Sequence, residues 1–139
     1  MSISLKGDKK ISNIPATKSK ALRINLNTDI YGTFAEIGAG QETARNFFRA
    51  GGASGTIAKA MSAYDKDFSD AIYGIEEDRR YVTEDRLKRM LHHEVDLIED
   101  RLSRKKHPEK LFFSYANTVA TIDFSKKFKG HGWVGIRFQ

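Results

Sequence analysis

The clearest hydrophobic pattern in the chain predicts a long amphipathic helix over residues 84–104. Apolar residues recur there at steps of three or four, at Leu87, Leu91, Val95, Ile98 and Leu102, which places them on one helical face. Thr83 precedes the pattern as a candidate N-cap. Acidic residues open this segment and arginines close it, as the helix dipole favours. We therefore expect a helix that buries one face.

The last third of the chain has the composition of β-strands. Leu111–Tyr115 and Thr118–Phe124 predict one long strand, or two strands broken at Asn117, and Trp133–Phe138 predicts another. Because a basic turn joins these segments, we expect them to pair as an antiparallel hairpin. Earlier in the chain, Ala21–Leu26 alternates apolar and polar residues, which predicts a short, half-buried strand.

Between these regions the pattern predicts two short helices joined at Gly51 and Gly52. Residues 38–50 carry apolar side chains at helical spacing, and Gly51 follows where a left-handed cap belongs. Ser54 is a candidate N-cap for a second helix that runs to Tyr64. Beyond it, the acidic run Glu76–Asp78 predicts a solvated turn.

The fold class predicted from these elements is α+β: three helices, the longest at about 84–104, packed on a small, mainly antiparallel sheet. Residues 1–20 are polar and lysine-rich and predict a flexible basic arm. Residues 21–139 predict a single domain, with the alternative that it is the first domain of a longer chain. The predicted core consists of Leu26, Phe34, Phe47, Phe48, Ile57, Met61, Leu87, Leu91, Ile98, Phe112, Val119, Ile122, Val134 and Ile136.

Composition narrows the classes of function. The 139 residues include no cysteine, which excludes disulfides, thiolate metal sites and cysteine nucleophiles. No apolar run approaches the roughly 18 residues of a membrane span, and the N-terminus lacks the apolar core of a signal peptide. We therefore expect a cytoplasmic protein with no membrane partner. The net charge of +6 comes from basic ends around an acidic centre; such ends are solvated or attract a polyanion.

Six of the eleven glycines lie between Gly32 and Gly55, and they raise the question of phosphate binding. The dinucleotide fingerprint fails because Thr43 stands at its third position, and the P-loop fails because no lysine separates Gly55 from Thr56. One reading is that the glycines let two short helices pack closely. The other is a phosphate site at a helix start, formed by Ser54, Gly55, Thr56, Arg45 and Arg49.

Two sequence resemblances accompany this stretch. Gly32, Phe34 and Gly40 match part of the motif of the nicotinate-nucleotide adenylyltransferases, but the family's two phosphate-stabilising histidines fall at Gly38 and Gln41. More broadly, residues 39–65, Asn117–Thr121 and Gly130–Trp133 resemble the N-terminal part of an uncharacterised bacterial family. Its members carry the labels nicotinate-nucleotide adenylyltransferase and TonB-dependent receptor. This resemblance implies a cytoplasmic protein without an assigned activity.

Other chemistry finds less support in the sequence. His92 and Asp96 share a helix face, but two ligands do not make a metal site, so we predict neither a metal nor a cofactor. Residues 126–133 mix basic and aromatic side chains without an RNA-binding signature, which favours a hairpin turn over nucleic-acid binding. Arginines around residues 79–89 predict surface ion pairs worth under about 1 kcal/mol each. No catalytic residue is assigned, and whether the chain is an enzyme stays open.

Two functions are therefore predicted. The first is a non-enzymatic module that acts through oligomerisation or a protein partner. The alternative is a nucleotide- or phosphate-binding domain of a divergent enzyme similar to the nicotinate-nucleotide adenylyltransferases.

Overall fold

The computed structural model describes residues 15–102, 105–122, 125 and 129–139. Along the chain, the helices and strands are α2 (Thr17–Asn25), β1 (Ile30–Gly38), α3 (Thr43–Ala50), the 3-10 turn η1 (Ala53–Gly55), β2 (Ile57–Ala63), α4 (Lys66–Tyr73), α5 (Glu84–Arg101), β3 (Leu111–Ala120) and β4 (His131–Phe138). None of the described helices is both long and apolar enough to cross a lipid bilayer.

The strands form one mixed sheet in the order β2-β1-β3-β4. β1 pairs in parallel with both β2 and β3, and β4 pairs with β3 in antiparallel fashion. The α+β class and the β3–β4 hairpin are thus confirmed, whereas a mainly antiparallel sheet and a count of three helices were wrong. The described residues form four α-helices, and the central strand β1 was not predicted at all.

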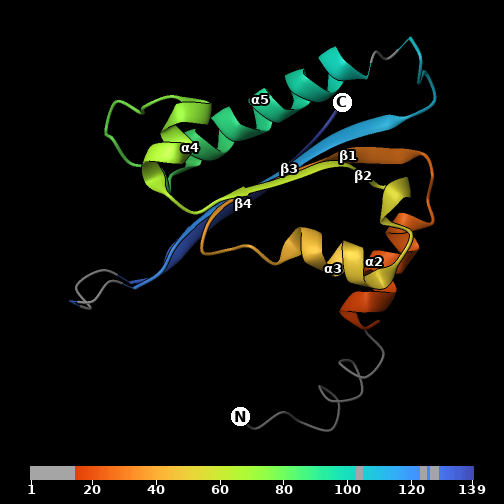
Figure 1. The fold of residues 1–139 in the computed structure, drawn as a ribbon, viewed down its shortest axis with the longest axis horizontal. Helices are drawn as coiled ribbons and strands as arrows, with labels where there is room; N and C mark the ends of the chain where they lie inside the picture. Colours follow the sequence, from red (N-terminus) through yellow and green to blue (C-terminus); the bar gives the residue numbers. More distant parts are fainter. Residues whose placement is uncertain (1–14, 103–104, 123–124, 126–128) are drawn as a thin grey trace, which may run out of the picture.

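Helices cover both faces of the sheet (Figure 1). The connection through α3 carries the chain from β1 to β2, and the connection through α4 and α5 carries it back past β1 to β3. These two crossovers run in opposite directions along the sheet, and right-handed crossovers of opposite direction place their helices on opposite faces. As a result, α3 lies on one face, and α4 and α5 lie on the other. α2 precedes β1 and packs against α3, on the same side of the sheet.

Each face of the sheet has its own buried cluster. Ala35, Ile37 and Ala116 pack under α5 against Leu87 and Met90. Phe34 and Phe113 point to the other face and pack with Ala44 of α3. Phe34, Leu87, Ile98 and Phe112 of the predicted core are buried, whereas Leu26, Phe48, Ile122, Val134 and Ile136 are more than half exposed.

Two segments adopt a different secondary structure from the one predicted. Ala21–Asn25 belongs to α2, and Leu26 is its C-cap. The helix buries Ala21 and Asn25, four residues apart, and leaves Leu22, Ile24 and Leu26 37%, 37% and 69% exposed. Ile57–Ala63 forms the strand β2 and not a helix, because it pairs in parallel with β1. Residues 1–14 of the predicted arm lie outside the described residues, and Thr17–Lys20 belong to α2.

A buried arginine holds α4 and the following loop against α5. Arg86 is fully buried and donates hydrogen bonds to Glu76 Oε2 (2.9 Å), Ser69 Oγ (2.7 Å), Asp70 Oδ1 (2.6 Å) and the carbonyl of Gly74 (2.7 Å). Glu76 is also buried, so the prediction of a wholly solvated acidic turn was wrong. Arg86 does pair with the acidic cluster, as predicted, but the pair is buried, so the predicted contribution of under about 1 kcal/mol, which applies to exposed pairs, does not apply to it.

Candidate functional site

An uncovered apolar surface lies on the outermost strand, β4. Val134, Ile136 and Phe138 are 64%, 52% and 55% exposed. They pair in register with Asn117, Tyr115 and Phe113 of β3, so they stand on the sheet face that carries α3. We call these three side chains the β4 surface. The sequence predicted Val134 and Ile136 to be core residues, yet no described residue covers them.

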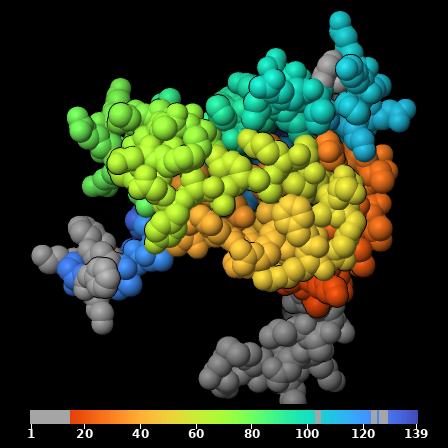
Figure 2. All heavy atoms as spheres, in the orientation of Figure 1, coloured from red at the N-terminus to blue at the C-terminus, as the bar shows by residue number. Residues whose placement is uncertain are grey.

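The intervening β4 residues explain this arrangement, because they face α5. A Cβ atom on Gly135 would lie 3.0 Å from Leu87 and 3.1 Å from Leu91. The guanidinium of Arg137 contacts the ring of His92 on α5. β4 therefore packs against α5 on one side and leaves its other side bare. The described residues of β3 and β4 nearest the hairpin turn, drawn in blue, project from the body of the molecule (Figure 2).

The outer edge of β4 is also open to a further strand. Within the described residues, β4 ends the sheet and no strand pairs with its outer backbone groups. Its pairing with β3 is regular, without a bulge, and His131–Phe138 contains no proline. Proteins commonly block such an edge with lysine, proline or a bulge. The one arginine of β4 contacts α5, so this edge is competent to pair.

Ser54, Gly55 and Thr56, which the sequence analysis placed at the start of a helix, do not begin a helix in the structure. No α-helix begins at Ser54; a 3-10 turn of three residues leads directly into β2. The backbone N–H groups of Gly55 and Thr56 donate to the carbonyls of Gly52 and Ala53 at 3.0 and 2.9 Å. They are therefore not free to bind an anion in this conformation. Phosphate binding itself stays a prediction.

The two predicted arginines lie on α3 and pair locally. Arg45 and Arg49 form exposed ion pairs with Glu42 at 3.5 and 3.9 Å. Arg45 lines a shallow hollow together with Met61 and Ser62 near the end of β2, whereas Ser54 precedes the start of that strand. The structure thus separates Arg45 from the Ser54–Thr56 segment by most of the length of β2.

A buried carboxylate that the sequence analysis missed occupies the N-terminus of α3. Glu36 Oε1 accepts hydrogen bonds from the backbone N–H of Thr43 (2.9 Å) and from Asn117 Nδ2 (3.0 Å), and the N–H of Ala44 lies 3.4 Å from Oε2. This helix end lies where β1 and β3 finish, a common ligand position in open sheets. Because Glu36 already supplies the anion there, the position does not favour a phosphate.

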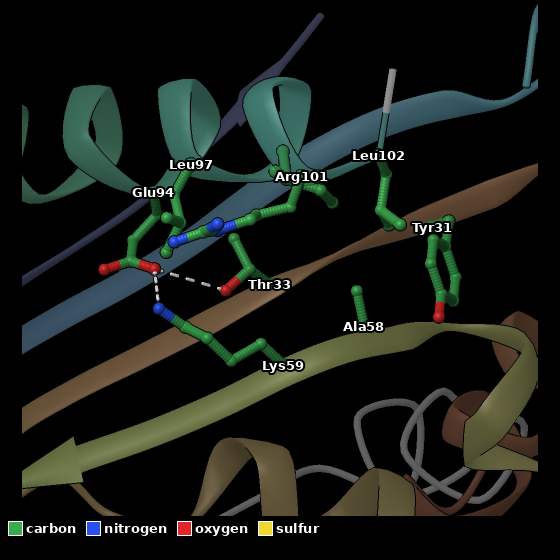
Figure 3. Close-up of a pocket in the computed structure, with 9 residues that line it drawn as sticks. Tyr31, Thr33, Ala58, Lys59, Glu94, Leu97, Arg101 and Leu102 are labelled. Carbon is green, nitrogen blue, oxygen red and sulfur yellow. Dashed lines mark hydrogen bonds and ion pairs between the residues drawn. The ribbon is translucent and has the colours of Figure 1, made fainter. Parts of the chain in front are cut away.

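A second missed carboxylate lies between α5 and the sheet. Glu94 is fully buried and accepts hydrogen bonds from Lys59 Nζ (2.5 Å), Thr33 Oγ1 (3.3 Å) and the Tyr73 hydroxyl (2.9 Å). Two of these contacts appear as dashed lines in Figure 3. Burial and the negative charge of Glu94 raise the pKa of Tyr73, so this phenol stays neutral and donates. No sequence motif marks the group, because its members come from four separate elements.

Comparison with known proteins supports the fold and not an activity. No protein-family model matches the chain, and no curated protein sequence matches it. A solved structure described as competence/damage inducible protein CihA from Agrobacterium tumefaciens is similar over 91% of this chain and 81% of its own, with a TM-score of 0.58 and 14% sequence identity. At that identity the likeness shows a shared fold. The comparisons give no support to the resemblance to the uncharacterised bacterial family or to its labels, nicotinate-nucleotide adenylyltransferase and TonB-dependent receptor.

Proposed function

We propose that this protein is a non-enzymatic module that self-associates through β4. The observation that carries the proposal is the edge strand β4. It pairs regularly with β3, has an open outer edge, and leaves Val134, Ile136 and Phe138 more than half exposed. The partner we propose is a second copy of the same chain, because the edge offers each copy the same self-complementary surface.

The geometry of the sheet restricts how two copies pair. An antiparallel β4–β4 pair has a two-fold axis perpendicular to the sheet, so side chains directly opposite each other lie on the same face. Val134 and Ile136 can therefore stand opposite each other or opposite their own symmetry mates, but not opposite Gly135. In either register the two β4 surfaces join into one apolar strip.

Charge does not oppose this pairing. The β4 surface carries no charged side chain, and the guanidinium of Arg137 contacts His92 on the other face of the sheet. Like charges facing each other across a strand pair would be destabilising, and none is present on this strip. Pairing also removes from water apolar groups that a single copy leaves exposed.

Analytical ultracentrifugation over a range of concentrations tests the proposal. We expect a monomer–dimer equilibrium for the wild type and a monomer for Val134→Lys, which places a charge in the strip. Ile75→Lys is the matched control, because Ile75 is 70% exposed and lies outside the sheet; it should dimerise like the wild type. A monomeric wild type, or a Val134→Lys variant that dimerises normally, would contradict the proposal.

The lack of native cysteine permits a second test. Each pairing described above predicts one kind of disulfide-linked dimer on mild oxidation. A single cysteine at position 134 cross-links if Val134 faces its symmetry mate, and one at position 136 if Ile136 does. A mixture of the two variants cross-links if Val134 faces Ile136. A cysteine at Ile75 should not cross-link. Equal cross-linking at all three positions would indicate random collision and would refute the specific interface.

Phosphate or nucleotide binding by Ser54, Gly55, Thr56, Arg45 and Arg49 remains a second candidate function. The hydroxyl of Thr56 is fully buried and has no hydrogen-bond partner within the described part of the chain, so a ligand reaches it only if this segment opens. Thermal-shift assays with nucleotides and inorganic phosphate, with and without magnesium, test this candidate. A ligand at 100 times its dissociation constant stabilises by roughly 2.7 kcal/mol. The absence of any shift would exclude it.

A further inference from the structure

The face of the sheet under α5 contains a cleft of about 440 Å³ between that helix and strands β1 and β2. It lies at the opposite end of the strand order from β4. Its volume falls in the range of small-molecule sites. The cleft is therefore separate from the surface proposed for self-association.

The walls of the cleft divide into an apolar part and a charged end. Ala58, Leu97, Ile98 and Leu102 supply aliphatic surface, and Tyr31 adds an aromatic ring. Lys59, Glu94 and Arg101 supply the charges, and Figure 3 shows the Arg101 guanidinium directed along α5 toward the Glu94 end. Such a division suits a ligand with an apolar body and one polar group.

The charges at this end do not balance. Glu94 is satisfied by three donors, and Lys59 is its only cationic partner among them. The ammonium of Lys59 has three donors, and its side chain is 39% exposed, so it can reach a second acceptor. Arg101 has neither an ion pair nor a hydrogen bond with any residue that the structure describes. Two cations and one carboxylate leave one positive charge facing the cleft.

From this geometry we propose that the cleft binds an organic monocarboxylate with an apolar, ring-sized body. The carboxylate accepts hydrogen bonds from Arg101, whose planar fork matches a carboxylate, and from the free donors of Lys59. The body packs between Leu97 and Tyr31. A single negative charge neutralises the cleft, whereas a phosphate dianion leaves an excess negative charge beside the buried Glu94, which is costly.

Binding to the full chain is measured by isothermal titration calorimetry and by amide chemical shifts, with 3-phenylpropanoate as the probe. We expect binding that shifts the amides of Ala58 and of residues 97–102. We expect at least about tenfold weaker binding of 3-phenylpropan-1-ol, which has the same body without the charge. We expect no binding of 3-phenylpropylamine.

Variants locate the charge that recognises the probe. Arg101→Gln should weaken 3-phenylpropanoate binding at least about tenfold, with an unchanged circular dichroism spectrum because Arg101 is exposed. Arg23→Gln, an exposed arginine on α2, is the matched control and should bind like the wild type. No binding at millimolar probe, equal binding of the alcohol, or unchanged binding by Arg101→Gln would overturn the proposal. Tighter binding of inorganic phosphate than of the carboxylate would also overturn it.

Discussion

Replacement of Arg86 by methionine should destabilise the fold by about 3 kcal/mol. The variant loses four hydrogen bonds made by a fully buried guanidinium, two of them to carboxylates. Each carboxylate keeps one cation, because Arg89 still pairs with Glu76 and Lys66 with Asp70. We therefore place the cost at the lower end of the roughly 3–5 kcal/mol range for breaking a buried ion pair. For a chain of this length, the melting temperature should fall by about 10 °C.

The loss should depend on pH in a defined direction. The hydrogen bond from Arg86, and then that from Lys66, holds the pKa of Asp70 below its usual value of 3.8. A lowered pKa in the folded state contributes stability above pH 3.8, and that stability is lost as the pH falls through the folded-state pKa. The difference in free energy of unfolding between the wild type and Arg86→Met should therefore be largest at pH 7 and should decrease below about pH 4.

Urea unfolding, followed by circular dichroism at concentrations where the wild type is monomeric, measures both effects. Arg89→Met is the matched control, because Arg89 contacts the same oxygen of Glu76 but is 52% exposed, and it should cost under about 1 kcal/mol. The reasoning would be refuted by Arg86→Met within about 1 kcal/mol of the wild type at pH 7. A difference that stays constant down to acid pH would refute the part that concerns Asp70.

Three further predictions concern buried groups near the sheet. Tyr73→Phe removes a donor from Glu94 and should cost about 1–3 kcal/mol in urea unfolding; since the pKa of Tyr73 is raised above 10.0, the stability that it contributes should be present below pH 10 and decline above it. Glu36→Ala removes the acceptor for the first N–H groups of α3, so the amides of Thr43 and Ala44 should exchange faster in hydrogen-exchange experiments, while α5 amides stay protected. Gly32→Ala places a Cβ 2.4 Å from the carbonyl oxygen of Phe113 and should cost about 3 kcal/mol in thermal unfolding. Gly51→Ala meets no atom within 4 Å, so its cost should come from backbone strain at φ 87° alone, roughly 1–3 kcal/mol.

The sequence predicted an element correctly where the element's own residues include its cap and its buried face. α5 begins at the predicted cap, with the Thr83 side chain accepting from the N–H of Arg86, and its apolar stripe faces the sheet. The hairpin of β3 and β4 also followed from local pattern and a connecting turn. In both cases the neighbours along the chain decide the structure, so the sequence could be read directly.

The candidate sites could not be read in this way, because their partners are distant in the chain. Glu36 meets Asn117 across 81 positions, and Glu94 meets Thr33 across 61. The exposure of Val134 and Ile136 likewise depends on where α3 lies, and no property of β4 itself reports that. The alternation of apolar residues along β4 predicted that Val134 and Ile136 are buried. Only the three-dimensional arrangement showed that no described residue covers them.

The sequence by itself determined the α+β class, the long helix and the terminal hairpin, since caps and periodicity act over a few residues. Only the tertiary structure decided that Ile57–Ala63 is a strand and that Ala21–Asn25 is part of a helix. The alanines and Met61 of β2 suit a helix locally, but parallel pairing with β1 satisfies the backbone of the whole segment at once. Long-range hydrogen bonding of this kind outweighs the small helix preferences of single residues.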